Sequence, residues 1–164
     1  MKKIRFGILG AGGIADRRTM PGMQLAEHAE IVAVMELDPA VAERLRAKYS
    51  AKRAYTDEEA LLADPEIDAV SVCTPNNMHP TISIDAMRAG KDVLCEKPAA
   101  RTYAEALEMQ KVQHETGRIL NIGVVNRFND SVNLIKQYID EGRLGEVYHV
   151  HVSFRAHRSI PGLG

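Results

Sequence analysis

The chain carries a glycine-rich segment, G-A-G-G-I-A at residues 10–15, directly after a short apolar run at residues 4–9. A pattern typical of a helix follows this segment. Glycines between a strand and a helix let the backbone turn sharply and let a phosphate approach the bare main chain. The segment therefore predicts a strand, a turn and a helix whose N-terminal amides hold the pyrophosphate of a dinucleotide.

Each position in this segment has a physical role, and a later acidic residue extends the pattern. Gly10 permits the turn, Gly12 admits the pyrophosphate, and Ala15 lets the helix pack closely on the strand. Glu36 lies 21 residues after Ala15, close to the spacing of the acid that binds the adenosine ribose hydroxyls. We expect these cofactor-binding residues: Gly10, Gly12, Gly13, Ile14, Ala15 and Glu36. The alternative is a glycine turn that binds no ligand.

The cofactor class follows from the residues at the end of the second apolar run. A carboxylate at Glu36 would repel the 2′-phosphate of NADP, and the neighbouring Leu37 offers no cation to bind it. The sequence therefore favours NAD over NADP.

A second motif, C-E-K-P at residues 95–98, ends another apolar run. A lysine acts as a general base only where desolvation or nearby positive charge lowers its pKa. A carboxylate pointing at Lys97 would oppose that change, so we expect Glu96 to point elsewhere. Lys97 is the candidate catalytic residue, and the alternative is a surface lysine at a strand end.

Apolar runs alternate with longer helical patterns along the first three quarters of the chain. The runs lie at residues 4–9, 31–35, 53–55, 69–73, 92–95 and 119–125. Strands that are apolar on both faces predict a parallel sheet covered by helices on each side, a doubly wound Rossmann-type α/β fold. Capping-box spacing at Thr56 and Thr102, and glycines at Gly90 and Gly117, mark helix ends. Pro21 predicts a break in the first helix.

The pattern changes after about Asn126. An amphipathic helix is predicted around residues 132–139, and residues 146–154 alternate between apolar and polar side chains, as in a strand with one wet face. We therefore expect a dinucleotide-binding domain at residues 1–125 and the start of a truncated α+β substrate domain at residues 126–164. The last strand would lack a partner within the chain, which predicts a homo-oligomer.

Composition excludes several classes of partner. The 164 residues include 21 basic and 22 acidic side chains, a formal net charge of -1, so no basic footprint favours nucleic acid or an anionic membrane. No apolar run approaches the length of a membrane span, and two cysteines make no disulfide framework, so we expect a cytoplasmic protein with small-molecule partners. His149 and His151 share a strand face, but without a further ligand we expect no metal site.

Three motifs in order resemble those of the Gfo/Idh/MocA oxidoreductases, which include glucose-fructose oxidoreductase and inositol dehydrogenase. They are the glycine segment, C-T-P-N-N-M-H at residues 73–79, and C-E-K-P at residues 95–98. The resemblance implies a cofactor lined by Thr74, Pro75, Asn76, His79 and Glu96, with a structural role at the start of a helix as the alternative for His79. It also implies that Lys97 touches cofactor and substrate, and that Arg127 lies near the substrate.

The resemblance implies an oxidoreductase that uses NAD, or less favourably NADP, to transfer a hydride to or from a sugar, polyol or similar molecule. Family members are much longer, and the Asp and His segment that completes their acid-base machinery would follow Gly164. We therefore expect the chain to be a cofactor-binding portion with little activity of its own. The alternative is a dinucleotide sensor or regulatory protein without catalysis, which would have no need of Lys97.

Overall fold

A computed structural model describes residues 3–153, and the chain divides into two compact units, Met1–Gly123 and Val124–Gly164. The division lies after Gly123, where the sequence pattern placed it after residue 125. Each unit is described by itself.

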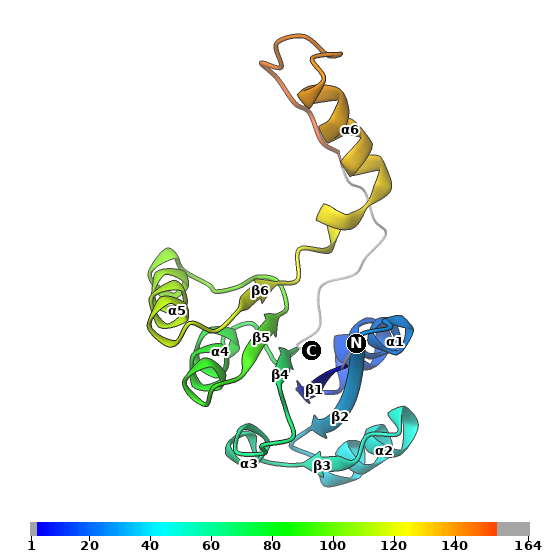
Figure 1. Ribbon diagram of the computed structural model, residues 1–164, viewed down its shortest axis with the longest axis vertical. Coiled ribbons are helices and arrows are strands. Elements are labelled where there is room, and N and C mark those ends of the chain that lie inside the picture. The colour runs from blue at the N-terminus through cyan, green and yellow to red at the C-terminus, as the bar shows by residue number, and fades with distance from the viewer. Residues whose placement is uncertain (1–2, 154–164) are drawn as a thin grey trace. The chain divides into compact units, whose positions relative to one another are not determined.

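The first unit is built around a six-stranded parallel sheet (Figure 1). Its strand order is β3-β2-β1-β4-β5-β6, so the chain starts at the centre of the sheet and winds outward in both directions. This order confirms the doubly wound Rossmann-type fold. The strands are β1 (Ile4–Leu9), β2 (Ala29–Met35), β3 (Arg53–Tyr55), β4 (Ala69–Val72), β5 (Asp92–Cys95) and β6 (Leu120–Ile122).

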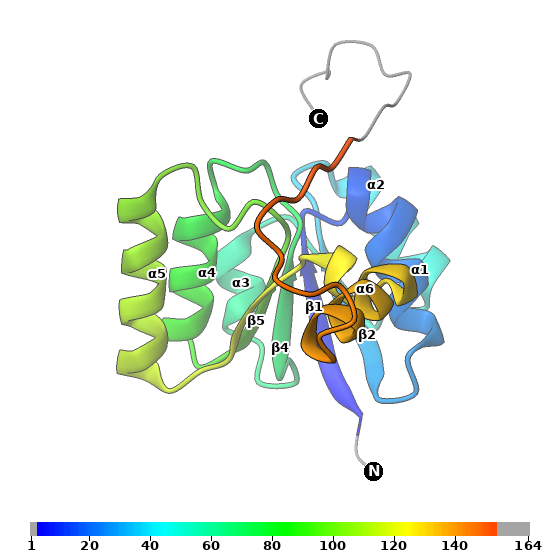
Figure 2. The same ribbon diagram turned by 90° about the horizontal axis from the view of Figure 1, so that it is seen from above.

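Helices cover both faces of the sheet, as Figures 1 and 2 show. One apolar cluster joins strand residues such as Leu9 and Val72 to helices α3 (Glu58–Leu62), α4 (His79–Arg88) and α5 (Tyr103–Thr116). A second cluster joins Ile8 and Val34 to η1 (Ala15–Thr19), α1 (Met20–Leu25) and α2 (Pro39–Tyr49). Neighbouring residues such as Ile8 and Leu9 thus face opposite layers, which explains why the strands are apolar at nearly every position.

Helix ends follow local chemistry, with one correction to the sequence analysis. Thr102 and Glu105 form the predicted capping box, and Gly117 ends α5 in the left-handed conformation. The predicted cap at Thr56 is wrong: the Asp57 carboxylate accepts the hydrogen bond from the Ala60 N–H, at 2.8 Å, and begins α3 one residue later. Asp and Thr are both good caps, and only the backbone path decides between adjacent candidates.

The first helix changes its geometry just before Pro21 but is not broken there. A π-helical turn, η1, precedes the α-helical α1, and Pro21 lies in the first turn of α1. Residues 13–25 are helical without a gap, so a change from π to α geometry stands where a break was expected. Proline cannot donate to the preceding turn, and the regular α pattern is lost in that turn.

The second unit contains the 3₁₀ helix η2 (Val125–Phe128) and the amphipathic helix α6 (Asp130–Asp140), which the sequence predicted. The prediction of a strand at residues 146–154 is wrong for the residues that the structure describes. Residues 146–153 have no strand assignment, and Phe154 lies outside the described residues. A strand needs a neighbour for its backbone groups, and residues 3–153 provide none for this segment.

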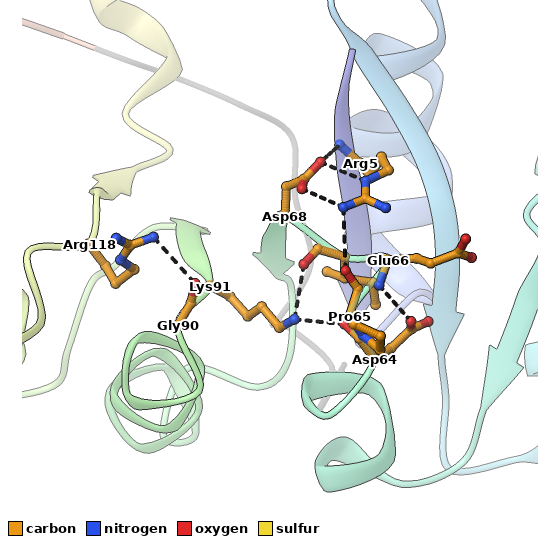
Figure 3. Close-up of polar contacts among 9 residues, drawn as sticks. Arg5, Asp64, Pro65, Glu66, Asp68, Gly90, Lys91 and Arg118 are labelled. Carbon is orange, nitrogen blue, oxygen red and sulfur yellow. Dashed lines mark hydrogen bonds and ion pairs between the residues drawn. The ribbon is translucent and has the colours of Figure 1, made fainter. Parts of the chain in front are cut away.

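The amino-terminal edge of the sheet is closed by paired charges (Figure 3). Arg5, at the start of β1, donates to both carboxylate oxygens of Asp68, at 2.7 and 2.8 Å. The ammonium of Lys91, whose residue is 7% exposed, donates to the backbone oxygens of Asp64 and Ile67, at 2.7 and 3.0 Å. Burial lowers the pKa of Lys91.

Candidate functional site

The glycine segment turns immediately after β1 and passes against the loop that follows β4. Gly10 has a φ of +73°, and a Cβ placed there would lie 2.9 Å from the backbone N of Thr74. Both the backbone conformation and this close approach exclude a side chain. The predicted requirement for glycine at Gly10 thus has a physical cause in the packing of two loops at the carboxyl-terminal edge.

Gly12 brings the glycine segment to the acid at the end of β2. The Gly12 N–H donates to Oε1 of Glu36 at 2.7 Å, and a Cβ at Gly12 would lie 2.8 Å from the same oxygen. Gly13 has a φ of +49°, and Ile14 is the first residue with right-handed helical dihedrals. The N–H groups of Ala15 and Asp16 already donate to the oxygen of Gly12, so among the described residues those of Gly13 and Ile14 are the amides of this turn without an acceptor. Ile14 is 42% exposed, whereas Ala15 is fully buried in the core. The segment therefore offers backbone donors and one carboxylate beside them.

The loop after β4 packs against the glycine segment at the same edge of the sheet. Pro75 and Asn76 are exposed, whereas Thr74 is half-buried. The Oγ1 atom of Thr74 is buried and has no hydrogen-bond partner among residues 3–153. A buried hydroxyl without a partner is costly, and it marks this loop as one whose polar groups are not all used within the chain.

Glu96 and Lys97 follow β5 at the same edge. Oε1 of Glu96 accepts from the Thr19 hydroxyl at 3.4 Å, and Oε2 accepts from the backbone N–H of Lys97 at 3.2 Å. The Lys97 side chain is exposed and forms no ion pair with any residue of the described part. Both oxygens of the Glu96 carboxylate thus have partners other than the Lys97 ammonium.

The contact with Thr19 is one that the sequence did not predict. Thr19 is at the end of η1, and its hydroxyl also accepts from Sγ of Cys73 at 3.8 Å. No motif marks this residue, because the contact depends on how η1 packs across the ends of β4 and β5. Thr19 links the helix of the glycine segment to the acid beside Lys97.

The two cysteines are free and unsuited to nucleophilic chemistry. Cys95 is fully buried, and burial raises its pKa to about 11. Burial also raises the pKa of Cys73. The thiolate is the reactive form, so both groups are largely inert at neutral pH.

The other two predicted site residues are a buried side chain and a residue of the second unit. His79 is only 1% exposed, and both of its ring nitrogens lie within hydrogen-bond distance of backbone carbonyl oxygens. Arg127 is an exposed residue of η2 in the second unit, and its role stays a prediction. Among residues 3–153 no cluster of three or more side chains is arranged to hold a metal ion, and no helix there is long and apolar enough to cross a membrane.

The carboxyl-terminal edge thus brings together the glycine segment, Glu36, the Thr74 loop and Lys97. The backbone donors, the ribose-type carboxylate and the unpartnered Thr74 hydroxyl fit a dinucleotide in chemistry. In open parallel sheets, ligands bind outside the carboxyl ends where strand order reverses, here between β1 and β4. The exposed side chain of Lys97 follows β5, the strand next to β4.

Comparison with known proteins gives a consistent result. Inositol 2-dehydrogenase of Rhizobium meliloti is 35% identical over 152 residues, which cover 93% of this chain and 45% of the relative. D-glucoside 3-dehydrogenase of Escherichia coli is 32% identical over 161 residues, 98% of this chain and 46% of the relative. The chain therefore spans less than half the length of these relatives.

A solved structure has the same fold. The WlbA dehydrogenase of Bordetella pertussis, in complex with NADH and UDP-GlcNAcA, matches with a TM-score of 0.82 and 32% identity, over 90% of this chain and 45% of that one. A family model described as an oxidoreductase family with an NAD-binding Rossmann fold matches residues 4–124. The chain belongs to this family, the Gfo/Idh/MocA oxidoreductases.

Proposed function

We propose that this chain is the cofactor-binding part of an NAD-dependent oxidoreductase that acts on a hydroxyl group of a sugar, a polyol or a similar small molecule. One observation carries the proposal: the glycine segment, Glu36 and Lys97 share the carboxyl-terminal edge of one sheet. An edge that binds a dinucleotide but has no group to accept a proton would support cofactor binding without catalysis. Lys97 would supply such a group.

Glu36 supports NAD as the cofactor. Its carboxylate already accepts an N–H from Gly12, and the hydroxyls of an adenosine ribose would offer donors to the same side chain. A 2′-phosphate would instead meet a negative charge, with the 79%-exposed Leu37 beside it. The backbone amides of Gly13 and Ile14 and the polar groups of the Thr74 loop would hold the remainder of the cofactor.

Bound NAD would supply the hydride acceptor. Lys97 would orient the substrate hydroxyl and take its proton, because its amine is exposed and its neighbour Glu96 is held by Thr19 and by the Lys97 backbone. Arg127 would contribute to substrate binding. The proposed activity belongs to the whole protein, and we expect the 164-residue chain alone to bind NAD with little turnover.

The partners follow from the same proposal. The substrate would be a small hydroxylated molecule, and we expect a cytoplasmic homo-oligomer. Exposed apolar residues in the second unit support self-association, among them Val132, Ile135, Tyr148 and Val150. Light scattering of the purified chain would test this, and a monomer at all concentrations would contradict it.

Titration with NADH and NADPH tests the cofactor assignment. The chain should prefer NADH by at least about tenfold, or ~1.4 kcal/mol. Glu36→Ala should narrow that preference, whereas Glu30→Ala, an exposed glutamate at the other end of β2, should leave it unchanged. Equal affinity for the two cofactors in the unmodified chain would contradict the NAD assignment, and no binding of either would contradict the proposed function.

A longer form of the protein that contains the rest of the substrate domain tests catalysis. It should oxidise or reduce a sugar or polyol, and Lys97→Met should abolish the activity while NADH still binds. If the longer form bound NADH but turned over no sugar or polyol, and Lys97→Met left NADH binding unchanged, the result would favour a dinucleotide sensor over an enzyme.

A further inference from the structure

His79 is one of the most buried polar residues of the first unit. It is the first residue of α4, and it is 1% exposed although it lies near the edge where the candidate cofactor residues gather. A side chain enclosed in this way has no surface to offer a ligand. Its function must be exerted through the groups that it contacts.

The ring contacts two backbone oxygens from different loops. Nδ1 lies 2.7 Å from the oxygen of Pro98, and Nε2 lies 2.9 Å from the oxygen of Thr74. Carbonyl oxygens only accept hydrogen bonds, so each contact is a hydrogen bond only when the facing ring nitrogen carries a proton. A neutral imidazole carries one ring proton, so it donates to one of these carbonyls and packs against the other. In either tautomer the ring lies between the loop after β4 and the loop after β5, and the two carbonyls are 24 residues apart in the chain.

These loops carry the two halves of the candidate site. Thr74 begins the loop expected to line the cofactor, and its hydroxyl is the buried group without a partner. Pro98 directly follows Lys97, whose exposed side chain forms no ion pair in the described part of the chain. The Pro98 carbonyl, next to Lys97, therefore lies against the imidazole of α4, whereas no ion pair in the described part of the chain holds the amine of Lys97.

We propose that His79 is a positioning residue: it holds the Lys97 loop and the Thr74 loop at one spacing, so that the amine of Lys97 meets the cofactor edge in a defined place. This inference rests on the proposed function, because the spacing matters only if both loops serve one site. His79 then acts through the backbone of its neighbours and does not contact cofactor or substrate.

Two substitutions separate the two contacts. The amide nitrogen of asparagine lies near the position of Nδ1, so His79→Asn keeps a donor for Pro98 and loses the one for Thr74. The longer glutamine places its amide near Nε2, so His79→Gln keeps the Thr74 contact and loses the Pro98 contact. Ile82→Val, a buried position in the same helix, is the matched control, since it removes one methylene and leaves both contacts.

Hydrogen exchange of the cofactor-free chain reads out the bridge itself. Residues 97–102 should exchange about tenfold faster in His79→Gln than in His79→Asn, the effect of one hydrogen bond, because only asparagine keeps a donor for Pro98. Residues 74–78 should show the opposite order, because only glutamine keeps a donor for Thr74. Ile82→Val should change both segments equally or not at all. Equal acceleration of both segments in both histidine variants would reduce His79 to a core residue and overturn the proposal.

Coupling to the site is read from binding and from labelling of Lys97. In the unmodified chain, NADH should slow acylation of the Lys97 amine, followed by mass spectrometry. His79→Gln should reduce this protection several-fold with little change in NADH affinity, and His79→Asn should weaken NADH affinity more than it changes the protection. Identical protection and affinity in both variants would overturn the positioning role.

A measurement on the unmodified chain covers the case in which neither variant folds. The ¹⁵N resonances of the His79 ring should shift when NADH is added, although the ring makes no contact with it; unchanged resonances at saturating NADH would overturn the inference. Failure of the unmodified chain to bind NADH would instead overturn the proposed function, and the exchange experiment would still decide whether His79 bridges the loops.

Discussion

The two edges of the parallel sheet use their polar groups in opposite ways. At the amino-terminal edge, Arg5 is paired with Asp68 and Lys91 is bonded to two carbonyls (Figure 3). At the carboxyl-terminal edge, Lys97 is exposed without an ion pair in the described part, and neither the Thr74 hydroxyl nor the N–H groups of Gly13 and Ile14 have a partner there. The same fold thus closes one edge for stability and leaves the other available to a ligand.

Lysines show the difference most directly. Lys91 precedes β5 and Lys97 follows it, so one strand carries a lysine at each end. Burial of the Lys91 ammonium costs desolvation free energy, and its hydrogen bonds to two carbonyls offset that cost. A hollow of about 560 Å³ also lies beside Lys91, lined by residues such as Leu62 and Pro65, yet its one buried cation is already used. A hollow alone therefore does not identify a ligand site.

The largest expected effect is at Gly12. Gly12→Ala would place a Cβ 2.8 Å from Oε1 of Glu36, a flexible group that can move, so the free energy of unfolding should change by less than ~1 kcal/mol. The methyl group would keep a pyrophosphate from the backbone, and NADH affinity should fall about a hundredfold, or ~2.7 kcal/mol. Fluorescence titration and thermal unfolding measure the two quantities.

Gly22→Ala is the control for this change. No atom lies within 4 Å of a Cβ at Gly22, which is part of α1. Alanine there should stabilise the chain by about 0.5–1 kcal/mol and leave NADH affinity unaltered. Equal loss of affinity in both variants would mean that the glycine segment does not hold the cofactor.

The two lysines give the next largest effect, and their effects should be of different kinds. Lys91→Met would leave the oxygens of Asp64 and Ile67 without donors and should lower the free energy of unfolding by roughly 1–3 kcal/mol, with NADH affinity unchanged. Lys97→Met should leave stability within about 0.5 kcal/mol, because the side chain is exposed. Urea titration of both variants measures these changes in stability. If Lys97→Met lowered the free energy of unfolding as much as Lys91→Met does, the proposed difference between the two edges would be wrong.

The sequence predicted the features that depend on local chemistry. The six strands of the first unit, the glycine turn and the capping box of Thr102 all follow from residues close together in the chain, and the structure confirms them. The position of Glu36 next to Gly12 was also predictable, because strand length and topology fix where the second strand ends.

Features that depend on tertiary packing were not predictable. Nothing near Thr19 indicates its contact with Glu96, and nothing near His79 indicates that its ring reaches Pro98. The strand expected at residues 146–154 failed for a related reason, since alternation describes a sheet face but does not supply a neighbouring strand. The candidate site was thus predictable as a set of motifs, and its internal bonding was not.

Protonation of Asp64 at low pH should destabilise the amino-terminal edge of the sheet. Burial raises the pKa of this carboxyl, but hydrogen bonds from the Glu66 N–H, the Tyr55 hydroxyl and Arg53 outweigh burial and hold the pKa below its ordinary value of 3.8. A folded-state pKa below the unfolded one gives stability that is complete above the unfolded value and is lost as the pH falls through the folded value. The free energy of unfolding should therefore decline below about pH 4.

Asp64→Asn isolates this contribution. The variant should be less stable than the unmodified chain at pH 7, by roughly 1–3 kcal/mol, and the difference should shrink as the pH falls toward 3. Urea unfolding at pH 7, 5 and 3 measures it. A difference that does not change with pH would show that the charge of Asp64 contributes nothing.

The smallest expected effect concerns the two thiols near the open edge. Cys73 is half-buried and Cys95 is fully buried with a pKa of about 11, so alkylation at neutral pH should be slow at both and at least about tenfold slower at Cys95. Iodoacetamide labelling followed by intact mass, with Cys73→Ser to isolate Cys95, measures the two rates.

Bound NAD should then slow labelling of Cys73 a further few-fold, because its sulfur donates to Thr19, which also bonds Glu96 at the proposed cofactor edge. Cys95 should be affected less, since its access already requires local opening of the core. The Gly12→Ala variant supplies the control, because NAD added to it should protect neither thiol. If NAD still protected Cys73 in Gly12→Ala, the cofactor would have to bind a surface other than the glycine segment. The assignment of NAD to the carboxyl-terminal edge would then be wrong.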